Sequence, residues 1–131
     1  MFRRACAISD EGNVLGPSDS VVITGGGKDG KTTTDRVTMY NKNGYVFDLP
    51  QLNTARNSHG CGYYRFGGLK AYFLVAGGVD RNRQVLATTE IMTLGETFLS
   101  ETKWQVVSPL PVAVFGLRGA SNNFDVFMFG W

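Results

Sequence analysis

One stretch of the sequence has the spacing of a nucleotide-binding loop. Gly25 to Thr32 satisfies the phosphate-loop pattern G-x-x-x-x-G-K-[ST]. Such a loop must open a helix, because the N-terminal amides and the dipole of the helix hold the phosphates. Here Asp35 to Tyr40 carries β-branched, alternating residues and leads to an Asn43-Gly44 turn, which predicts a strand. We therefore interpret Gly25 to Thr32 as a glycine-rich turn between strands, and we expect no cofactor.

The single histidine limits the catalytic and metal chemistry of the chain. With His59 alone, a three-histidine metal site is impossible, and a Ser-His-Asp arrangement would have to be assembled from unrelated strands. The place of His59, one residue before Gly60 on a presumed outer strand, favours a structural or surface role. We expect no catalytic residue and no metal site.

The two cysteines and the charges indicate no further site. Cys6 and Cys61 are too few and too far apart to indicate a disulfide framework or a zinc site, so we expect two small buried residues. The net charge of +2 comes from 13 basic and 11 acidic residues without a block of like sign, which gives no footprint for nucleic acid or an anionic membrane. Neither a signal peptide nor a long apolar run is found, which favours a cytoplasmic location.

A repeat of apolar strands organises the chain. An apolar run leads into glycine at Val21 to Gly26, Phe73 to Gly78 and Val126 to Gly130. Gly77 lies 52 residues after Gly25, and Gly130 lies 53 residues after Gly77. A period of roughly 50 residues built of short strands is typical of β-propeller blades. Because these runs lack polar alternation, we expect them to be covered on both sides as the innermost strands.

Three further strands recur in each unit. The second strand keeps the 52-residue offset, whereas the third is offset by 58 residues, from Leu52 to Leu110, so the connection before it is longer in the second unit. The pairs are, in order, Val37 to Tyr40 with Thr89 to Met92, Tyr45 to Asp48 with Trp104 to Val107, and His59 to Tyr64 with Leu117 to Ser121. We divide the chain into an outer strand and loop of a preceding blade (1–19), two blades (20–70 and 71–123) and the inner strand of a third blade (124–131).

These residues together resemble the kelch-repeat family. The resemblance rests on strands ending in Gly-Gly or at Tyr40, on the Trp104 strand, and on the Leu-Pro-x-x-x-x-Arg segment from Leu49 to Arg56. Val114 stands where the pattern has Arg56, and Val46 stands where it has Trp104. The resemblance implies an all-β fold, a kelch-type β-propeller fragment with four-stranded antiparallel blades. Since propellers close with roughly four to eight blades, we expect a fragment of a longer product or a half that needs a partner.

Resemblance to kelch proteins also implies a function. The leading hypothesis is a protein–protein interaction module, a scaffold or adaptor without enzymatic activity. A kelch-type fold also occurs in copper-radical oxidases, so one alternative is a propeller-based enzyme, a galactose-oxidase-like oxidase or a hydrolase, with its site in further blades. Another alternative is a structural half-propeller that self-assembles.

Binding is expected in the loops at one face of the blades. Strand alternation opens two kinds of connection on that face, and their lengths differ while the strands keep register, which suits recognition loops on a rigid scaffold. We expect a protein or peptide partner, with possible self-association of the open array, and no nucleic acid or membrane partner. The candidate binding residues are Asn41, Lys42, Asn43, Arg65, Phe66, Lys70, Glu96, Phe98 and Glu101.

Overall fold

Two antiparallel sheets of four strands each make up most of the described protein. The computed structural model describes residues 5–10, 20–27, 32–41, 44–66, 70–94, 103–121 and 126–129. Within these residues the fold is all-β, without a helix. The first sheet has the order β1-β2-β3-β4, the second sheet has the order β5-β6-β7-β8, and β9 pairs with β10. The strands are β1 (Cys6–Asp10), β2 (Ser20–Thr24), β3 (Val37–Asn41), β4 (Val46–Leu49), β5 (Gly60–Phe66), β6 (Lys70–Ala76), β7 (Thr89–Leu94), β8 (Gln105–Val107), β9 (Arg118–Ser121) and β10 (Val126–Phe129).

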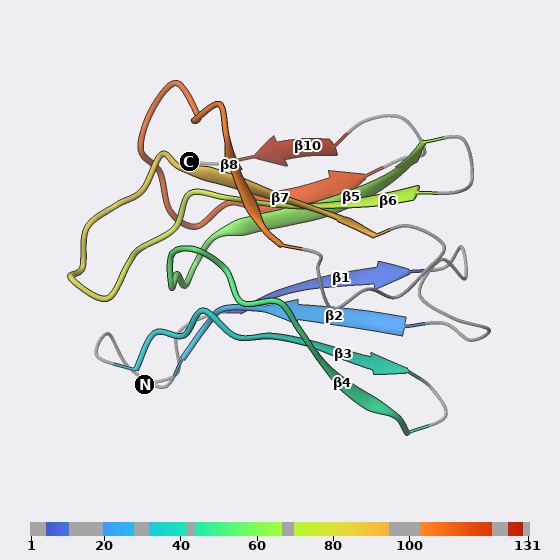
Figure 1. Ribbon diagram of the computed structural model, residues 1–131. Helices are drawn as coiled ribbons and strands as arrows, with labels where there is room; N and C mark the ends of the chain where they lie inside the picture. The colour runs from blue at the N-terminus through green and yellow to red at the C-terminus, as the bar shows by residue number, and fades with distance from the viewer. Residues whose placement is uncertain are drawn as a thin grey trace.

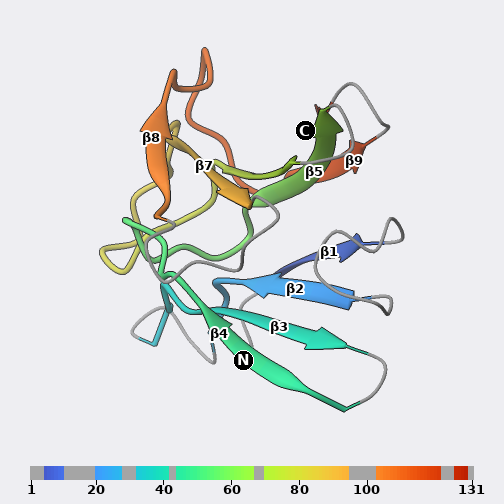
Figure 2. The ribbon, with the colours of Figure 1, turned by 45° about the vertical axis from the view of Figure 1, so that its right-hand side comes forward.

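The two sheets are arranged like the ribs of a fan. They lie one above the other in Figure 1. The turned view of Figure 2 shows β1, β5 and β9 gathered at one side, whereas β4 and β8 lie far apart. Strand β5 contacts β1, β9 and β10, so the first strands of the sheets are neighbours without sharing a sheet. No closed barrel or propeller is formed by the described part of the chain.

The strands group differently from our sequence-based expectation. We expected the strand from His59 to Tyr64 to be the last of its unit, but β5 pairs with β6, with Gly60 opposite Ala76. In the same way β9 pairs with β10, and β1 pairs with β2 instead of belonging to a separate blade. The Gly-Gly strands are therefore second in their sheets and not innermost. A period specifies the length of a unit but not its starting point, and the short separation of Phe66 from Lys70 favours a hairpin.

The repeat itself is reproduced in the backbone hydrogen bonds. The Gly26 amide donates to the Arg56 carbonyl at 2.9 Å, and the Gly78 amide donates to the Val114 carbonyl at 2.8 Å. Because both donors shift by 52 residues and both acceptors by 58, the two offsets found in the sequence describe real structural equivalence. Further matched bonds are Gly25 to Arg36 and Gly77 to Thr88, Thr34 to Gly26 and Leu86 to Gly78, Leu52 to Asp35 and Leu110 to Ala87, and Arg56 to Thr34 and Val114 to Leu86.

The core lies between the two sheets. Alternate residues of the first sheet face the second, and together they bury a set of apolar side chains that includes Phe73 and Val75 at 0% exposure. Removing such a side chain from water stabilises the fold by roughly 1.5–3 kcal/mol. On the far face of the first sheet Tyr40 is 44% exposed, so it does not pack between the described sheets as we expected of the strand aromatics. The core residues are Ile8, Val22, Val37, Met39, Leu49, Leu52, Cys61, Phe73, Val75, Met92 and Trp104.

The cysteines correct another expectation. Cys6 of β1 and Cys61 of β5 form a disulfide across the two sheets, with a Cα–Cα distance of 6.0 Å. Cys61 is buried, as expected, but it is not a separate small side chain. Their separation of 55 residues carried no signal, because only the packing of one sheet on the other brings the two strands within bonding distance.

The phosphate-loop pattern is followed by a strand, as predicted. β2 ends at Thr24 and β3 begins at Val37, and Gly25 and Gly26 adopt positive φ angles of 61° and 88°. In the described ranges, no helix has the length and hydropathy needed to cross a membrane.

Candidate functional site

The described loops gather at one end of the fan. Strand alternation brings four connections together there, and they occupy the left of Figure 1. We call this the pocket end. Its connections are residues 25–36, 50–59, 77–88 and 108–117.

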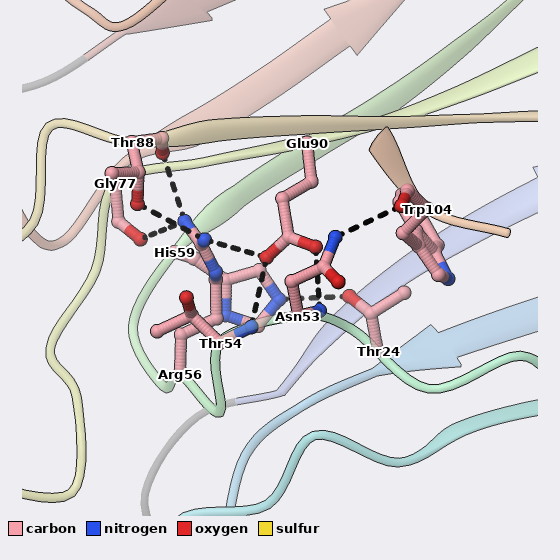
Figure 3. Close-up of polar contacts among 9 residues, drawn as sticks. All are labelled: Thr24, Asn53, Thr54, Arg56, His59, Gly77, Thr88, Glu90 and Trp104. Carbon is pink, nitrogen blue, oxygen red and sulfur yellow. Dashed lines mark hydrogen bonds and ion pairs between the residues drawn. The ribbon is translucent and has the colours of Figure 1, made fainter. Parts of the chain in front are cut away.

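A buried ion pair fastens the 50–59 connection to the second sheet (Figure 3). The Arg56 Nη2 atom lies 2.8 Å from Glu90 Oε2 of β7, and both side chains are 0% exposed. Arg56 also donates through Nη1 to the carbonyls of Gly77 and Thr88, both at 2.9 Å, and through Nη2 to Thr88 Oγ1 at 3.1 Å. Burial lowers the pKa of Arg56, while the Glu90 carboxylate opposes that shift. All of these partners belong to the fold, so the pair is a structural tie.

The remaining lone pairs of Glu90 hold the backbone of the same connection. Its Oε1 accepts the Asn53 amide at 2.6 Å, and its Oε2 accepts the Thr54 amide at 3.2 Å. Asn53 Nδ2 donates to the Trp104 carbonyl at 2.9 Å, and Trp104 Nε1 donates to the Pro50 carbonyl at 2.8 Å. The connection is therefore bonded at several points to the second sheet, which gives the pocket end a rigid base.

His59 is a structural residue at the start of β5. It is 1% exposed, and its Nε2 lies 2.7 Å from Thr24 Oγ1. The Thr24 hydroxyl is also 3.3 Å from the Cys6 carbonyl, to which it can donate only if His59 carries its proton on Nε2. The Cε1 atom of His59 faces Gly25, where a Cβ would collide with it and with the Arg56 carbonyl. A glycine is needed there both for this approach and for its positive φ.

A polar turn at residues 80–84 rises beside the 50–59 connection. The Asp80 carboxylate accepts the amides of Asn82 at 2.8 Å and Gln84 at 2.9 Å, which closes an Asx-type turn. Arg81 Nε donates to the Thr33 carbonyl at 2.8 Å, and Arg83 has a φ of 63°. The exposed guanidinium of Arg81 is therefore held in place from one side.

Two open pockets lie at this end. One of about 220 Å³ separates the 50–59 connection from the polar turn, and one of about 530 Å³ lies between the 25–36 connection and the end of β4. The smaller, which we call the turn pocket, has an almost entirely polar lining on the rigid base described above. Its lining residues are Asn53, Thr54, Ala55, Asp80, Arg81 and Asn82.

The binding residues predicted from the sequence belong to the opposite end of the fan. Asn41 ends β3, and its Oδ1 accepts the Tyr45 amide at 3.2 Å. Phe66 ends β5 opposite Lys70 at the start of β6, and Arg65 precedes it. Strand alternation brings these positions to one end, as expected, but their role in binding stays a prediction. Lys42, Asn43, Glu96, Phe98 and Glu101 lie outside the described residues.

The sequence analysis missed the residues around the turn pocket. Asp80-Arg81-Asn82 carries an Asx-turn signal that could have been noticed. Its proximity to Asn53 had no such signal, because it depends on how the two sheets pack. Among the described residues, no group of three or more His, Cys, Asp or Glu side chains could hold a metal ion.

Comparison with known proteins adds no family. No protein-family model matches the chain, and no curated protein matches it.

Proposed function

We propose that this chain is part of a kelch-type β-propeller and works as a protein-interaction module that binds a peptide segment of its partner at the pocket end. The fan of four-stranded sheets with neighbouring first strands supports the propeller, and so do the backbone hydrogen bonds that recur at offsets of 52 and 58 residues. A repeat in which each unit contacts only its neighbours is the construction principle of propellers.

The turn pocket is the observation that carries the binding proposal. Its walls come from two connections that are distant in sequence, and one wall is bonded to the buried Glu90 carboxylate. Polar groups presented on a rigid base lose little conformational entropy when a ligand binds. This is the usual way in which loops on a β scaffold recognise other proteins.

The charges at the pocket favour an acidic peptide. The Asp80 carboxylate is occupied by the amides of its own turn, so its charge is partly neutralised. Arg81 is anchored only through Nε, and its terminal nitrogens make no hydrogen bond to a described residue. Because a guanidinium presents a planar fork that matches a carboxylate, Arg81 is the residue that we assign to a Glu or Asp side chain of the partner. Such a module needs neither a cofactor nor catalysis.

The disulfide bears on where the module works. Disulfides persist in oxidising compartments and are rare in the cytosol. The Cys6–Cys61 bond therefore supports an oxidising or redox-variable environment over the cytoplasmic one that we expected from the sequence.

The experiment is a selection of peptides from a random displayed library on the immobilised, oxidised chain. Enriched peptides are synthesised with a fluorophore, and their Kd is measured by fluorescence anisotropy. We expect enrichment of acidic peptides, with a Kd at least about tenfold weaker for Arg81→Ala, since a lost charge-assisted contact is worth roughly 1.5–3 kcal/mol.

Arg36→Ala is the matched control. Arg36 is also exposed at the pocket end, but it lines the larger pocket and pairs with Asp48. Its Kd should stay within about twofold of the parent chain. If no peptide is enriched, or if both variants bind equally well, the proposed site is wrong.

A further inference from the structure

The two sheets are fastened to each other in two different ways on the two sides of the fan. On the side of the later strands, Arg56–Glu90 and the bonds between Trp104 and Pro50 tie the 50–59 connection to β7 and β8. On the side of the first strands, the Cys6–Cys61 disulfide joins β1 to β5. The first fastening is non-covalent and deeply buried, whereas the second can be opened by thiol–disulfide exchange.

Strand β1 depends on the disulfide more than any other described strand does. Its only described backbone pairing is with β2, so it is an edge strand of the first sheet. Between the two sheets it contacts β5, and the disulfide is the covalent part of that contact. Cys6 is only half-buried, while Cys61 is 4% exposed, so the Cys6 sulfur is the one that a thiolate can approach.

The disulfide lies at the pocket end of both strands. Cys6 is the first residue of β1, and Cys61 is the second residue of β5, directly after the 50–59 connection. The Cys6 carbonyl lies 3.3 Å from Thr24 Oγ1, which lies 2.7 Å from His59 Nε2. His59 is the last residue of the connection whose Asn53, Thr54 and Ala55 form one wall of the turn pocket. A change in the position of β1 is therefore passed to that wall through Thr24 and His59.

We propose that the Cys6–Cys61 disulfide is a redox-sensitive lock that holds β1 against β5 and keeps the turn pocket in its binding conformation. This proposal rests on the proposed binding function for its effect on ligand, but not for its effect on β1. In the forward reaction, two cysteine thiols and one glutathione disulfide give the Cys6–Cys61 bond and two glutathione thiols. The protein loses two electrons and two protons, and glutathione disulfide takes them up. A dithiol such as dithiothreitol reverses the reaction by two successive exchanges, the first at the exposed Cys6 sulfur.

Reduction should act locally, because the other fastening has no redox chemistry. Arg56, Glu90 and Trp104 keep the connection and the second sheet together without the sulfur bond. We therefore expect the reduced chain to keep its β-sheet circular dichroism while β1 becomes less protected.

The experiment compares the oxidised and the reduced full chain, so that no substitution can interfere with folding. Maleimide labelling and mass spectrometry establish the thiol state, and hydrogen exchange is then followed in β1 and in β6–β7. We expect exchange in β1 to rise at least tenfold on reduction and exchange in β6–β7 to change less than threefold. Equal exchange of β1 in both states would overturn the lock. Loss of protection in β6–β7 as well would show a plain structural crosslink and would also overturn it.

A second arm connects the lock to binding. Anisotropy titration of an enriched acidic peptide should give a Kd about tenfold weaker for the reduced chain, and Cys6→Ser/Cys61→Ser should match the reduced chain with or without dithiothreitol. An unchanged Kd on reduction would overturn the effect of the lock on the pocket. If β1 responds but no peptide is ever enriched, the peptide-binding proposal fails while the lock on β1 stands.

Discussion

The 50–59 and 108–117 connections are equivalent in the repeat, but only the first carries a charge into the interior. Their backbones make the same hydrogen bonds to the preceding connection and to the preceding Gly-Gly pair. At the matching side-chain position the first has Arg56, which is buried against Glu90, and the second has Val114. The residue equivalent to Glu90 in the first sheet is Thr38, so neither equivalent position leaves an isolated charge. The backbone defines the repeat, and side chains then differentiate the interfaces, since a buried charge is tolerated only with its partner.

Substitution of Glu90 should have the largest effect on this comparison. In Glu90→Ala, the free energy of unfolding should fall by about 3–5 kcal/mol, because Arg56 stays buried without its carboxylate. Thr38→Ala, at the equivalent position, should cost less than about 1 kcal/mol. Urea denaturation followed by tryptophan fluorescence measures both. Equal losses in the two variants would show that the ion pair is not what distinguishes the connections.

Substitution of Gly25 tests the close approach of the 50–59 connection. Gly25→Ala should lower the free energy of unfolding by about 2–3 kcal/mol, because a Cβ at a φ of 61° would collide with the Arg56 carbonyl and His59. Gly44→Ala is the control, because Gly44 has a φ of 88° but its Cβ would meet nothing within 4 Å. It should cost only about 1 kcal/mol, the conformational part alone. The same urea titration applies, and a control as costly as Gly25→Ala would refute the collision.

Trp104 and Val46 occupy equivalent positions with opposite exposure. Trp104 is 4% exposed and donates to the Pro50 carbonyl, whereas Val46 is 59% exposed. Trp104→Phe should reduce the free energy of unfolding by about 1–2 kcal/mol through the lost hydrogen bond, and Val46→Ala should change it by less than about 0.5 kcal/mol. Thermal unfolding by circular dichroism, which does not depend on tryptophan, gives the difference. A larger effect at Val46 would mean that the far face of the first sheet is covered in solution.

The smallest effect is expected for the exposed ion pair. Arg36 Nε and Asp48 Oδ1 are 3.3 Å apart, with side chains 67% and 68% exposed, in contrast to 0% for Arg56 and Glu90. Arg36→Ala should cost less than about 1 kcal/mol, and the loss should disappear at about 1 M salt because solvent ions screen the pair. Urea denaturation at low and high salt checks this, and a salt-independent loss would contradict it.

Much of the strand pattern could be predicted, whereas much of the site could not. The runs ending at Thr24 and Ala76 are apolar and β-branched, so they were recognised as strands, and their common spacing revealed the repeat. The grouping of strands was wrong because β5 resembles the end of one unit as well as the start of the next until its pairing with β6 is known. Asn53 and Arg81 gave no joint signal, because residues 28 positions apart in sequence line the same pocket only after the sheets have packed.

The sequence by itself determined an all-β chain of repeated strands with glycine-rich turns, because strand propensity and turn chemistry act between near neighbours and leave a readable period. Only the tertiary structure decided that Cys6 bonds to Cys61, that Arg56 pairs with Glu90, and that the turn pocket forms between two distant connections. Each of these depends on how one sheet lies on the other. That arrangement is set by the summed packing of many side chains, and no single pair of residues records it in the sequence.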